Sequence, residues 1–221
     1  MSAIVFDLDG TLIDSAPDIH ASANGVLADE GLGEITLQQA RSFIGHGAGI
    51  FVSRLMAAVG LGEDTETHDR MLGNFLERYE TEPKLTRLYP NVAETLHGLK
   101  DQGFTLGLCT NKPLSPTKVV LRHFDLLPLF DVVIGGDSLP VRKPDPAPLN
   151  TVFLQIGQRG LFVGDSEVDA ETAQRAAVPF ALYTEGYRKT PVSELYHSRS
   201  FQDFADLPAI AETLLNRAAA E

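Results

Sequence analysis

Residues 3–11 of the chain read Ala-Ile-Val-Phe-Asp-Leu-Asp-Gly-Thr, a short apolar run followed at once by two acidic residues and a glycine. An apolar run without polar alternation is typical of a strand that is buried on both faces of a parallel sheet. Because side-chain direction repeats every second residue along an extended chain, we expect Asp7 and Asp9 to point the same way from the end of this strand. Gly10 then lets the chain turn.

Similar apolar runs recur along the chain, and helix signals separate them. The runs predicted to be strands are Ala3–Phe6, Thr105–Cys109, Val132–Ile134, Leu161–Val163 and Phe180–Tyr183. Between them, Asn91 is predicted to cap a helix with Glu94 completing a capping box, and Ser115 to precede a helix with Pro116 at its first position. A last helix is predicted over Pro208–Ala220. This alternation predicts the α/β class with a parallel sheet.

The segment from Ser15 to Leu88 interrupts this alternation, because it contains helix patterns and no convincing strand. Its predicted helices are Pro17–Glu30, Leu37–Phe43, Ile50–Val59 and His68–Glu80, with glycines between several of them. We therefore expect residues 15–88 to form an inserted all-helical domain, and residues 1–14 and 89–221 to form the α/β core. The polar segment Glu185–Ser200 is expected to be a loop.

Composition excludes several classes of function. The 221 residues are 43% hydrophobic and 22% charged, as in ordinary globular proteins, and they carry a net charge of −12. Because this charge repels nucleic acid and anionic membranes, neither is expected as a partner. No apolar stretch approaches the roughly 20 residues that span a bilayer, and the expected location is the cytoplasm. The single cysteine, Cys109, forms no intrachain disulfide and is expected to be a small core residue.

The polar residues that follow the predicted strands indicate a metal site. Ligands of open parallel sheets bind beyond the carboxyl ends of the strands, where Asp7, Asp9 and Asp165 are found. Carboxylates this close together require a shared proton or a cation between them. An oxygen-only set without Cys or His suits Mg²⁺ and disfavours zinc.

The same edge of the sheet carries groups suited to a phosphoryl group. Lys143 follows the third strand and supplies a positive charge, Thr110 supplies a hydroxyl, and the turn at Asn111 supplies backbone donors. Lys112 lies near this edge and is interpreted as a charged loop residue without a role in the site. Together these residues predict an anion site inside an acidic protein.

The order of these residues resembles that of the haloacid dehalogenase-like superfamily, mainly its phosphatases, over the whole chain. The segments that carry the resemblance are Asp7 to Thr11, then Thr110, then Lys143 with Pro144, and then Gly164, Asp165 and Asp169. The resemblance implies a Rossmann-like core with the first strand at its centre. The helical insert is similar to the family's type 1 cap, which closes over the core.

The resemblance also implies a reaction. Asp7 attacks phosphorus to form an aspartyl-phosphate, and Asp9 acts as general acid and then as general base. Magnesium is held by Asp7, the backbone carbonyl of Asp9, and Asp165. Thr110, Asn111 and Lys143 bind the phosphoryl oxygens. Asp169 orients Lys143 or a metal-bound water.

Substrate selection is assigned to the insert, because the core residues address only the phosphoryl group. Gly45, His46 and Gly47 belong to a glycine-rich loop that offers backbone amides to a small anion, and Arg54 is a candidate for binding a carboxylate. The alternative is that the glycines only join two helices and Arg54 is solvated. This loop resembles that of bacterial 2-phosphoglycolate phosphatases, as do the pattern around Gly164 to Asp169 and the ending Tyr183 to Tyr187, although such loops often carry Asn where His46 stands. The resemblance implies 2-phosphoglycolate as substrate.

The sequence is also compatible with other functions. Dehalogenases of the superfamily typically lack the second Asp of the first motif, so Asp9 favours phosphoryl transfer. A phosphosugar mutase shares Asp7 and Asp9 but needs room for a bisphosphate to reorient. A third reading is a phosphate-binding module that has lost catalytic turnover.

Overall fold

All five apolar runs are strands of one sheet in the computed structural model, which describes residues 2–79 and 83–218. The six strands lie in the order β5-β4-β1-β6-β7-β8, and every neighbouring pair is parallel. Their bounds are β1 Ala3–Phe6, β4 Thr105–Cys109, β5 Val132–Ile134, β6 Gly160–Gly164, β7 Phe180–Tyr183 and β8 Arg199–Phe201. The predicted α/β class is confirmed.

Strand β1 occupies the middle of the sheet, between β4 and β6. From β1 the chain adds β4 and β5 on one side, and it then returns to add β6, β7 and β8 on the other. A reversal of this kind separates the connecting loops at the carboxyl ends of the strands, where open α/β sheets bind ligands. The topology therefore places Asp7, which follows β1, at the centre of that crevice.

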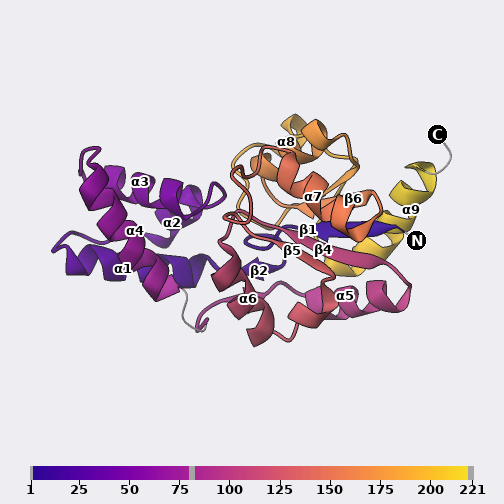
Figure 1. Cartoon of the computed structure of the whole chain (residues 1–221), viewed down its shortest axis with the longest axis horizontal. Coiled ribbons are helices and arrows are strands. Elements are labelled where there is room, and N and C mark those ends of the chain that lie inside the picture. The colour runs from indigo at the N-terminus through magenta and orange to yellow at the C-terminus, as the bar shows by residue number, and fades with distance from the viewer. Residues whose placement is uncertain (1, 80–82, 219–221) are drawn as a thin grey trace.

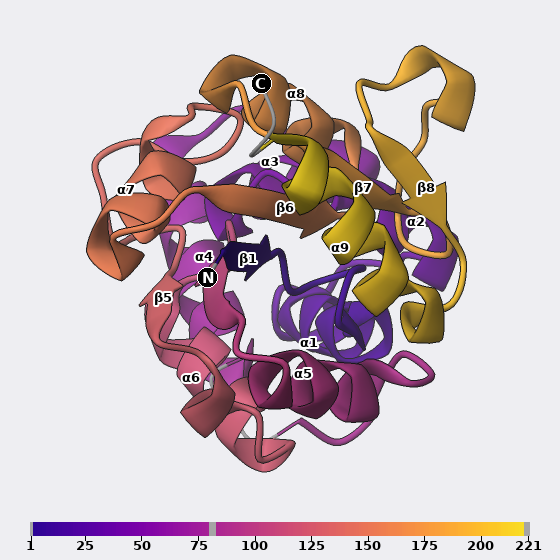
Figure 2. The same ribbon diagram turned by 90° about the vertical axis from the view of Figure 1, so that its right-hand side faces the viewer.

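Helices cover both faces of the sheet, as a sheet with two buried faces requires. Alternate residues of β1 belong to different apolar clusters: Ile4 and Phe6 pack with α5, α6 and α9, whereas Ala3 and Val5 pack with α7 and α8. Figure 2 shows α7 and α8 on one side of β1 and β6, and α5 on the other. The helices are α5 Val92–Asp101, α6 Leu114–His123, α7 Ala147–Ile156, α8 Glu167–Ala176 and α9 Leu207–Ala218, with short 3₁₀ turns η1 Leu127–Leu129, η2 Val192–Glu194 and η3 Phe204–Asp206.

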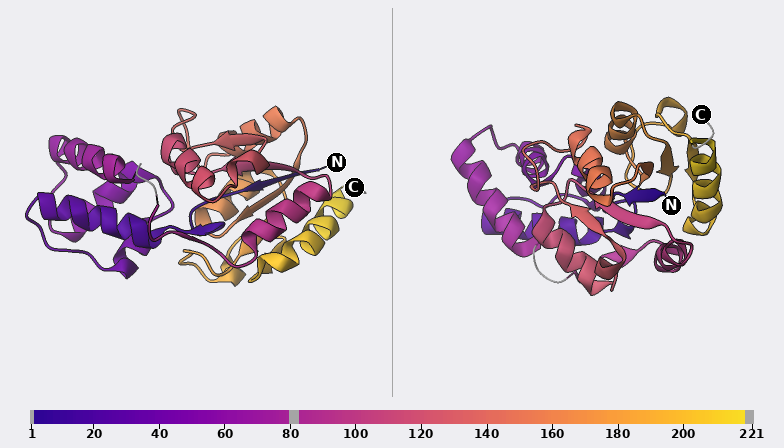
Figure 3. Two further views of the ribbon diagram at one scale, coloured as in Figure 1. Left: turned by 90° about the horizontal axis from the view of Figure 1, so that it is seen from below. Right: turned by 45° about the vertical axis from the view of Figure 1, so that its right-hand side comes forward.

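Four helices form a separate unit at one end of the molecule, far from both chain termini (Figures 1 and 3). They are α1 Ala16–Asp29, α2 Leu37–Phe43, α3 Ala48–Ala58 and α4 Thr65–Tyr79. The unit has its own apolar cluster, which includes Val26, Leu55 and Met71. The two chain segments that join it to the core pair with each other as short antiparallel strands, β2 Ile13–Asp14 and β3 Arg87–Leu88. None of the helices described in the structure has the length and apolar character needed to cross a membrane.

Several local predictions were wrong. Strand β8 lies partly in the segment expected to be a loop, because β7 supplies its hydrogen-bonding partner and its own sequence has no apolar run. Asn91 has a φ of 63° and donates its amide to Asp203 instead of capping α5. Helix α6 begins at Leu114, before Ser115, and its N-terminus follows Pro113. The predicted last residues of two helices, Glu80 and Ala220, lie outside the described residues.

Candidate active site

Three neighbouring strands deliver polar side chains to one edge of the sheet. Asp7 follows β1, Thr110 follows β4 and Asp165 follows β6, and all three are buried. Backbone hydrogen bonds extend the sheet past the strand ends, from Asp7 N to Val163 O at 2.9 Å and from Thr110 N to Ile134 O at 3.1 Å. The site is therefore built on rigid backbone, which fixes the positions of its functional groups.

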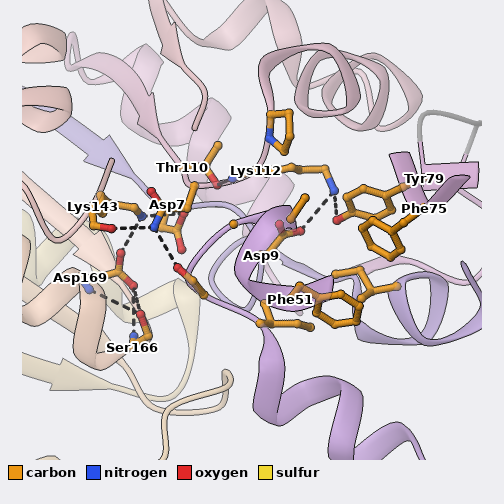
Figure 4. Close-up of a pocket in the computed structure, with 17 residues that line it drawn as sticks. Asp7, Asp9, Phe51, Phe75, Tyr79, Thr110, Lys112, Lys143, Ser166 and Asp169 are labelled. Carbon is orange, nitrogen blue, oxygen red and sulfur yellow. Dashed lines mark hydrogen bonds and ion pairs between the residues drawn. The ribbon is translucent and has the colours of Figure 1, made fainter. Parts of the chain in front are cut away.

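Three buried carboxylates cluster at this edge, and Figure 4 shows two of them, Asp7 and Asp169, on either side of Lys143. Asp7, Asp165 and Asp169 each offer an oxygen, and these oxygens lie within 4.8 Å of one another. Lys143 Nζ lies 2.9 Å from Asp7 Oδ1 and 2.7 Å from Asp169 Oδ1. One ammonium group neutralises only part of the charge of three ionised carboxylates.

The pKa values of these groups reflect the same excess of negative over positive charge. Burial raises the pKa of Asp7 to about 7, with Lys143 opposing the shift and Asp169 adding to it. Burial also raises the pKa of Asp165 well above its usual value, and repulsion from Asp169 and Asp7 adds to the effect. For Lys143, burial lowers the pKa, but attraction to Asp169 and Asp7 outweighs it and the pKa is raised overall. Lys143 therefore stays charged, and the carboxylates need a further cation in order to ionise fully.

Both carboxylate oxygens of Asp169 accept hydrogen bonds from neighbouring residues. Its Oδ1 accepts a hydrogen bond from Lys143, and its Oδ2 accepts from the backbone N–H and the hydroxyl of Ser166, at 3.1 and 2.6 Å. The Ser166 hydroxyl accepts in turn from Asp169 N, so the pair forms a capping box at the start of α8. A carboxylate with both oxygens engaged in this way orients Lys143 and supports the loop after β6.

Asp165 is fixed from two sides. It accepts hydrogen bonds from Thr11 Oγ1 at 3.0 Å and from the backbone N–H of Tyr187 at 2.5 Å. The hydroxyl of Tyr187 donates to Asp14 Oδ1 at 2.6 Å and accepts from Ala16 N, next to the crossing into the helical unit. The sequence marked Tyr187 only as the end of the segment Tyr183–Tyr187 and assigned it no role, because its contact with Asp165 joins residues that are far apart in the chain.

The donor set fits a hard divalent cation. Among the described residues, the carboxylates of Asp7, Asp165 and Asp169 form the group with metal-ligand spacing, and it contains no His or Cys. Oxygen donors of this kind suit Mg²⁺ and not zinc. The oxygens of Asp165 accept hydrogen bonds from Thr11 and Tyr187, just as those of Asp169 accept from Lys143 and Ser166, so all three carboxylates are candidates for holding the ion. The neighbouring thiol of Cys109 is buried, which raises its pKa to about 12 and keeps it protonated.

Asp9 lies at the boundary between the core and the helical unit. Its Oδ1 accepts a hydrogen bond from Ser15 Oγ at 2.6 Å, and its side chain lines the same cavity as Asp7. Figure 4 shows Asp9 on the side of the cavity that faces the aromatic residues of the helical unit, whereas Asp7 lies beside Lys143 and Asp169. The two carboxylates predicted to work together are thus in one site but in different surroundings.

Lys112 is not the loop charge that its sequence context suggested. Its side chain is 1% exposed, and Nζ lies 3.7 Å from Asp9 Oδ1 and 3.5 Å from the centre of the Tyr79 ring. Nζ also donates a hydrogen bond to the Tyr79 hydroxyl. Burial lowers the pKa of Lys112, and the attraction of Asp9 opposes this shift. The position next to Thr110 and Asn111 was the one signal in the sequence that pointed to the site.

The glycine-rich loop of the helical unit lies against the core. Asn111 Nδ2 donates to Gly45 O and to Lys143 O, each at 2.9 Å. Gly47 has a φ of 86°, and a Cβ atom at this position would approach Asn111 O to 3.3 Å. Gly45 and Gly47 both line the cavity. The side chain of Asn111 therefore joins the loop to the core, and only its backbone N–H remains a candidate for binding a phosphoryl oxygen.

The structure separates the other two residues assigned to substrate selection. His46 lines an adjoining cavity beside Asp165 and Lys189, and burial together with Arg54 and Lys189 lowers its pKa. Arg54 lines neither cavity among the described residues. Its guanidinium donates to Phe43 O at 3.0 Å and so holds the end of α2. The position of Arg54 does not favour a role in carboxylate binding.

The cavity between the two parts of the molecule has a volume of about 50 Å³. Its floor carries Asp7, Thr110 and Lys143, and the helical unit supplies an apolar wall. In that wall, the rings of Phe51 and Phe75 are stacked at 5.0 Å, and those of Phe75 and Tyr79 at 5.3 Å. The remaining apolar lining residues of the helical unit are Ile19, Ile44 and Ala48. The arrangement suits a small ligand with an anionic end.

Comparison with known proteins agrees with this geometry. The chain is 47% identical over 217 residues to a phosphoglycolate phosphatase of Cereibacter sphaeroides, covering 97% of this chain and 100% of that protein. It is 40% identical over 215 residues to a phosphoglycolate phosphatase of Rhodospirillum rubrum, covering 93% and 88%.

Solved structures and a family model give the same result. A crystal structure of a predicted phosphoglycolate phosphatase from Haemophilus somnus matches with a TM-score of 0.90 and 35% identity, covering 95% of this chain and 97% of that one. Residues 4–183 match the family model described as haloacid dehalogenase-like hydrolase. The predicted resemblance is confirmed, and the chain belongs to the haloacid dehalogenase-like hydrolase family.

Proposed function

We propose that the protein is a Mg²⁺-dependent phosphatase that hydrolyses 2-phosphoglycolate to glycolate and phosphate. The observation that carries the proposal is the placement of Asp7, with Lys143 at 2.9 Å and Asp165 beside it, on the floor of a cavity walled by the helical unit. The substrate follows from the relatives named phosphoglycolate phosphatase, which are similar to this chain over nearly its full length.

Asp7 and Asp9 have different roles in the proposed reaction, according to their positions in the site. A carboxylate oxygen of Asp7 attacks phosphorus, and the bond from phosphorus to the ester oxygen breaks. Asp9 donates its proton to the leaving oxygen, so glycolate departs and an aspartyl-phosphate remains. Asp9 then removes a proton from water, which attacks phosphorus and releases phosphate from Asp7.

The remaining groups bind and orient the phosphoryl group. Thr110 Oγ1, the backbone N–H of Asn111 and Lys143 Nζ are assigned to the phosphoryl oxygens, and Asp169 holds Lys143 in place. Magnesium, held by Asp7, Asp165 and the backbone carbonyl of Asp9, neutralises charge on the transferring group when it is bound. We also propose that the helical unit, residues 15–88, acts as a cap that selects the substrate and excludes water.

Phosphate release tests the proposal directly. We expect hydrolysis of 2-phosphoglycolate in Mg²⁺, loss of activity in EDTA, and a fall of at least ~10³-fold in kcat for Asp7→Asn, since a nucleophile acts only in the transition state. Asp125→Asn is the matched control, because Asp125 is exposed and its φ of 56° suits Asn. Undiminished rates in Asp7→Asn would overturn the proposal. Faster transfer to a sugar phosphate than to water would identify a mutase instead.

A further inference from the structure

A buried ammonium group lies in the active-site cavity with no role in the steps described above. Among the described residues, Lys112 is one of two cationic residues that line the cavity, and the other, Lys143, is engaged by Asp7 and Asp169. Lys112 comes from the loop after β4, where Pro113 and Asn111 also line the cavity. Its side chain is almost completely removed from solvent.

The contacts of Lys112 leave donor capacity for a ligand. An ammonium group has three N–H donors. One is donated to the Tyr79 hydroxyl, a neutral acceptor, and a second faces Asp9 Oδ1, with which Nζ forms an ion pair at 3.7 Å. The same Asp9 oxygen already accepts from Ser15 at 2.6 Å. One of the three N–H donors is thus left for a ligand, and an anion that accepts from it inside the cavity would be stabilised by a charge-assisted hydrogen bond.

The position of Lys112 relative to Asp9 fixes which part of a substrate it meets. Asp9 is assigned to the ester oxygen, because it protonates the leaving group. In 2-phosphoglycolate a single methylene group separates that ester oxygen from the carboxylate. Lys112 Nζ lies on the far side of Asp9 from Asp7 and Lys143, next to the Tyr79 ring (Figure 4). A carboxylate one carbon beyond the ester oxygen therefore comes within reach of Lys112.

We propose that Lys112, positioned by Tyr79, binds the carboxylate of the substrate and so selects phosphate esters with an acid group one carbon from the ester oxygen. The inference rests on the proposed phosphatase function and names the residue that recognises the substrate class. It replaces Arg54, which the structure places outside the cavity. The stacked rings of Phe51, Phe75 and Tyr79 bound the same end of the cavity and limit the ester to a small one.

A matched pair of substrates tests the proposal. Ethyl phosphate keeps the phosphate ester and its methylene group but carries a methyl group where 2-phosphoglycolate has the carboxylate. For Lys112→Met we expect the ratio of kcat/KM for 2-phosphoglycolate to that for ethyl phosphate to fall about 10- to 100-fold, mainly through a raised KM for 2-phosphoglycolate, the range expected for loss of a charged hydrogen bond. Lys118→Met, which removes a lysine from α6 outside the cavity lining, should leave the ratio unchanged.

The outcomes separate this inference from the proposed function. Equal losses for both esters would overturn the inference, because Lys112 would then act only through Asp9. Wild-type protein that hydrolyses neither ester, with Mg²⁺ present, would overturn the proposed function itself. If wild type prefers 2-phosphoglycolate and Lys112→Met keeps that preference, the function stands and the inference fails.

A second measurement does not depend on the stability of a Lys112 variant. Crystals of Asp7→Asn soaked with 2-phosphoglycolate and Mg²⁺ should show the carboxylate within hydrogen-bond distance of Lys112 Nζ. A carboxylate bound at His46 or at the Gly45 loop would overturn the inference, even if the phosphoryl group lies beside Thr110 and Lys143.

Discussion

Asp7 combines two properties that oppose each other, deep burial and a negative charge. Burial raises its pKa to about 7, and the lysine at 2.9 Å only partly offsets the effect because Asp169 shares that lysine. A nucleophilic carboxylate must be ionised to attack phosphorus. A divalent cation at the cluster would supply the missing charge, and its binding would then be coupled to the ionisation of Asp7.

The pKa of Asp7 predicts how the stability of the metal-free protein depends on pH. Its ordinary value is 3.8 and the folded value is about 7, so the native state binds more protons than the unfolded state between these pH values. The free energy of unfolding in EDTA should therefore fall as pH rises from about 4 to about 7. Excess Mg²⁺ should reverse this fall, because it binds the ionised carboxylates. Melting temperatures measured across this range, with EDTA and with Mg²⁺, check the prediction.

Asp7→Asn provides the control for this measurement. The variant lacks the titrating carboxylate at position 7, so its melting temperature in EDTA should fall less steeply with pH than that of wild type. Parallel curves for the two proteins would contradict the assignment of the pH dependence to Asp7.

At the scale of elements, the loop after β7 closes against the turn after β1. Gly186 lies so near Asp165 that a Cβ atom at this position would be 2.3 Å from both Asp165 Oδ2 and Gly10 O. Gly10 has a φ of 89°, and its own Cβ would lie 2.5 Å from the same carboxylate oxygen. The next residue, Tyr187, donates its backbone N–H to Asp165. The two loops therefore set the position of Asp165 by direct backbone contact.

Gly186→Ala should displace the Asp165 carboxylate, because the added methyl group meets backbone as well as the side chain. We expect Mg²⁺ affinity to fall about 10- to 100-fold, the range typical of changes next to metal ligands. The activity measured as a function of Mg²⁺ concentration gives this affinity. Gly33→Ala is the control, since no atom lies within 4 Å of its Cβ position. An unchanged Mg²⁺ requirement in Gly186→Ala would contradict this role.

At the scale of the whole molecule, the protein has separate apolar cores with a cavity between them. The helical unit packs around its own cluster, and the sheet packs around two others. The chain crosses between these parts through the paired strands β2 and β3. Side-chain contacts also bridge them, including Asn111 to Gly45 O and Lys189 to Ser42 O. We therefore expect that the helical unit can be destabilised while the sheet stays folded.

Leu55→Ala tests this independence. Leu55 is completely buried in the cluster of the helical unit, and its truncation should cost about 2–5 kcal/mol. Hydrogen exchange should show lost protection in α1–α4 and retained protection in β1, β4 and β6. Ala57→Ser, on the exposed face of the same helix, should leave both regions unchanged. Equal loss of protection throughout the chain would contradict two independently stable parts.

The sequence by itself determined the α/β class, and it predicted a helical insert and a candidate site at the strand ends. Four predicted strands have the bounds that the structure shows, Ala3–Phe6 among them, because a strand buried on both faces must be apolar along its whole length. The acidic residues could be recognised in the sequence as a candidate site, because carboxylates grouped at strand ends require a shared proton or a cation, whatever the details of the fold.

Only the tertiary structure decided which side chains meet across the cavity. One such group joins three separate segments: Lys112 comes from a loop of the core, Tyr79 from a helix of the inserted unit, and Asp9 from the turn after β1. No local sequence pattern relates these three residues. Strand β8 and the contact of Tyr187 with Asp165 were hidden for the same reason. The periodicity and spacing of residues predict the secondary structure of a segment and which of its faces is buried. A contact between distant segments depends on the packing of whole elements, and so a lysine that looked solvated lies buried beside the proposed general acid, Asp9.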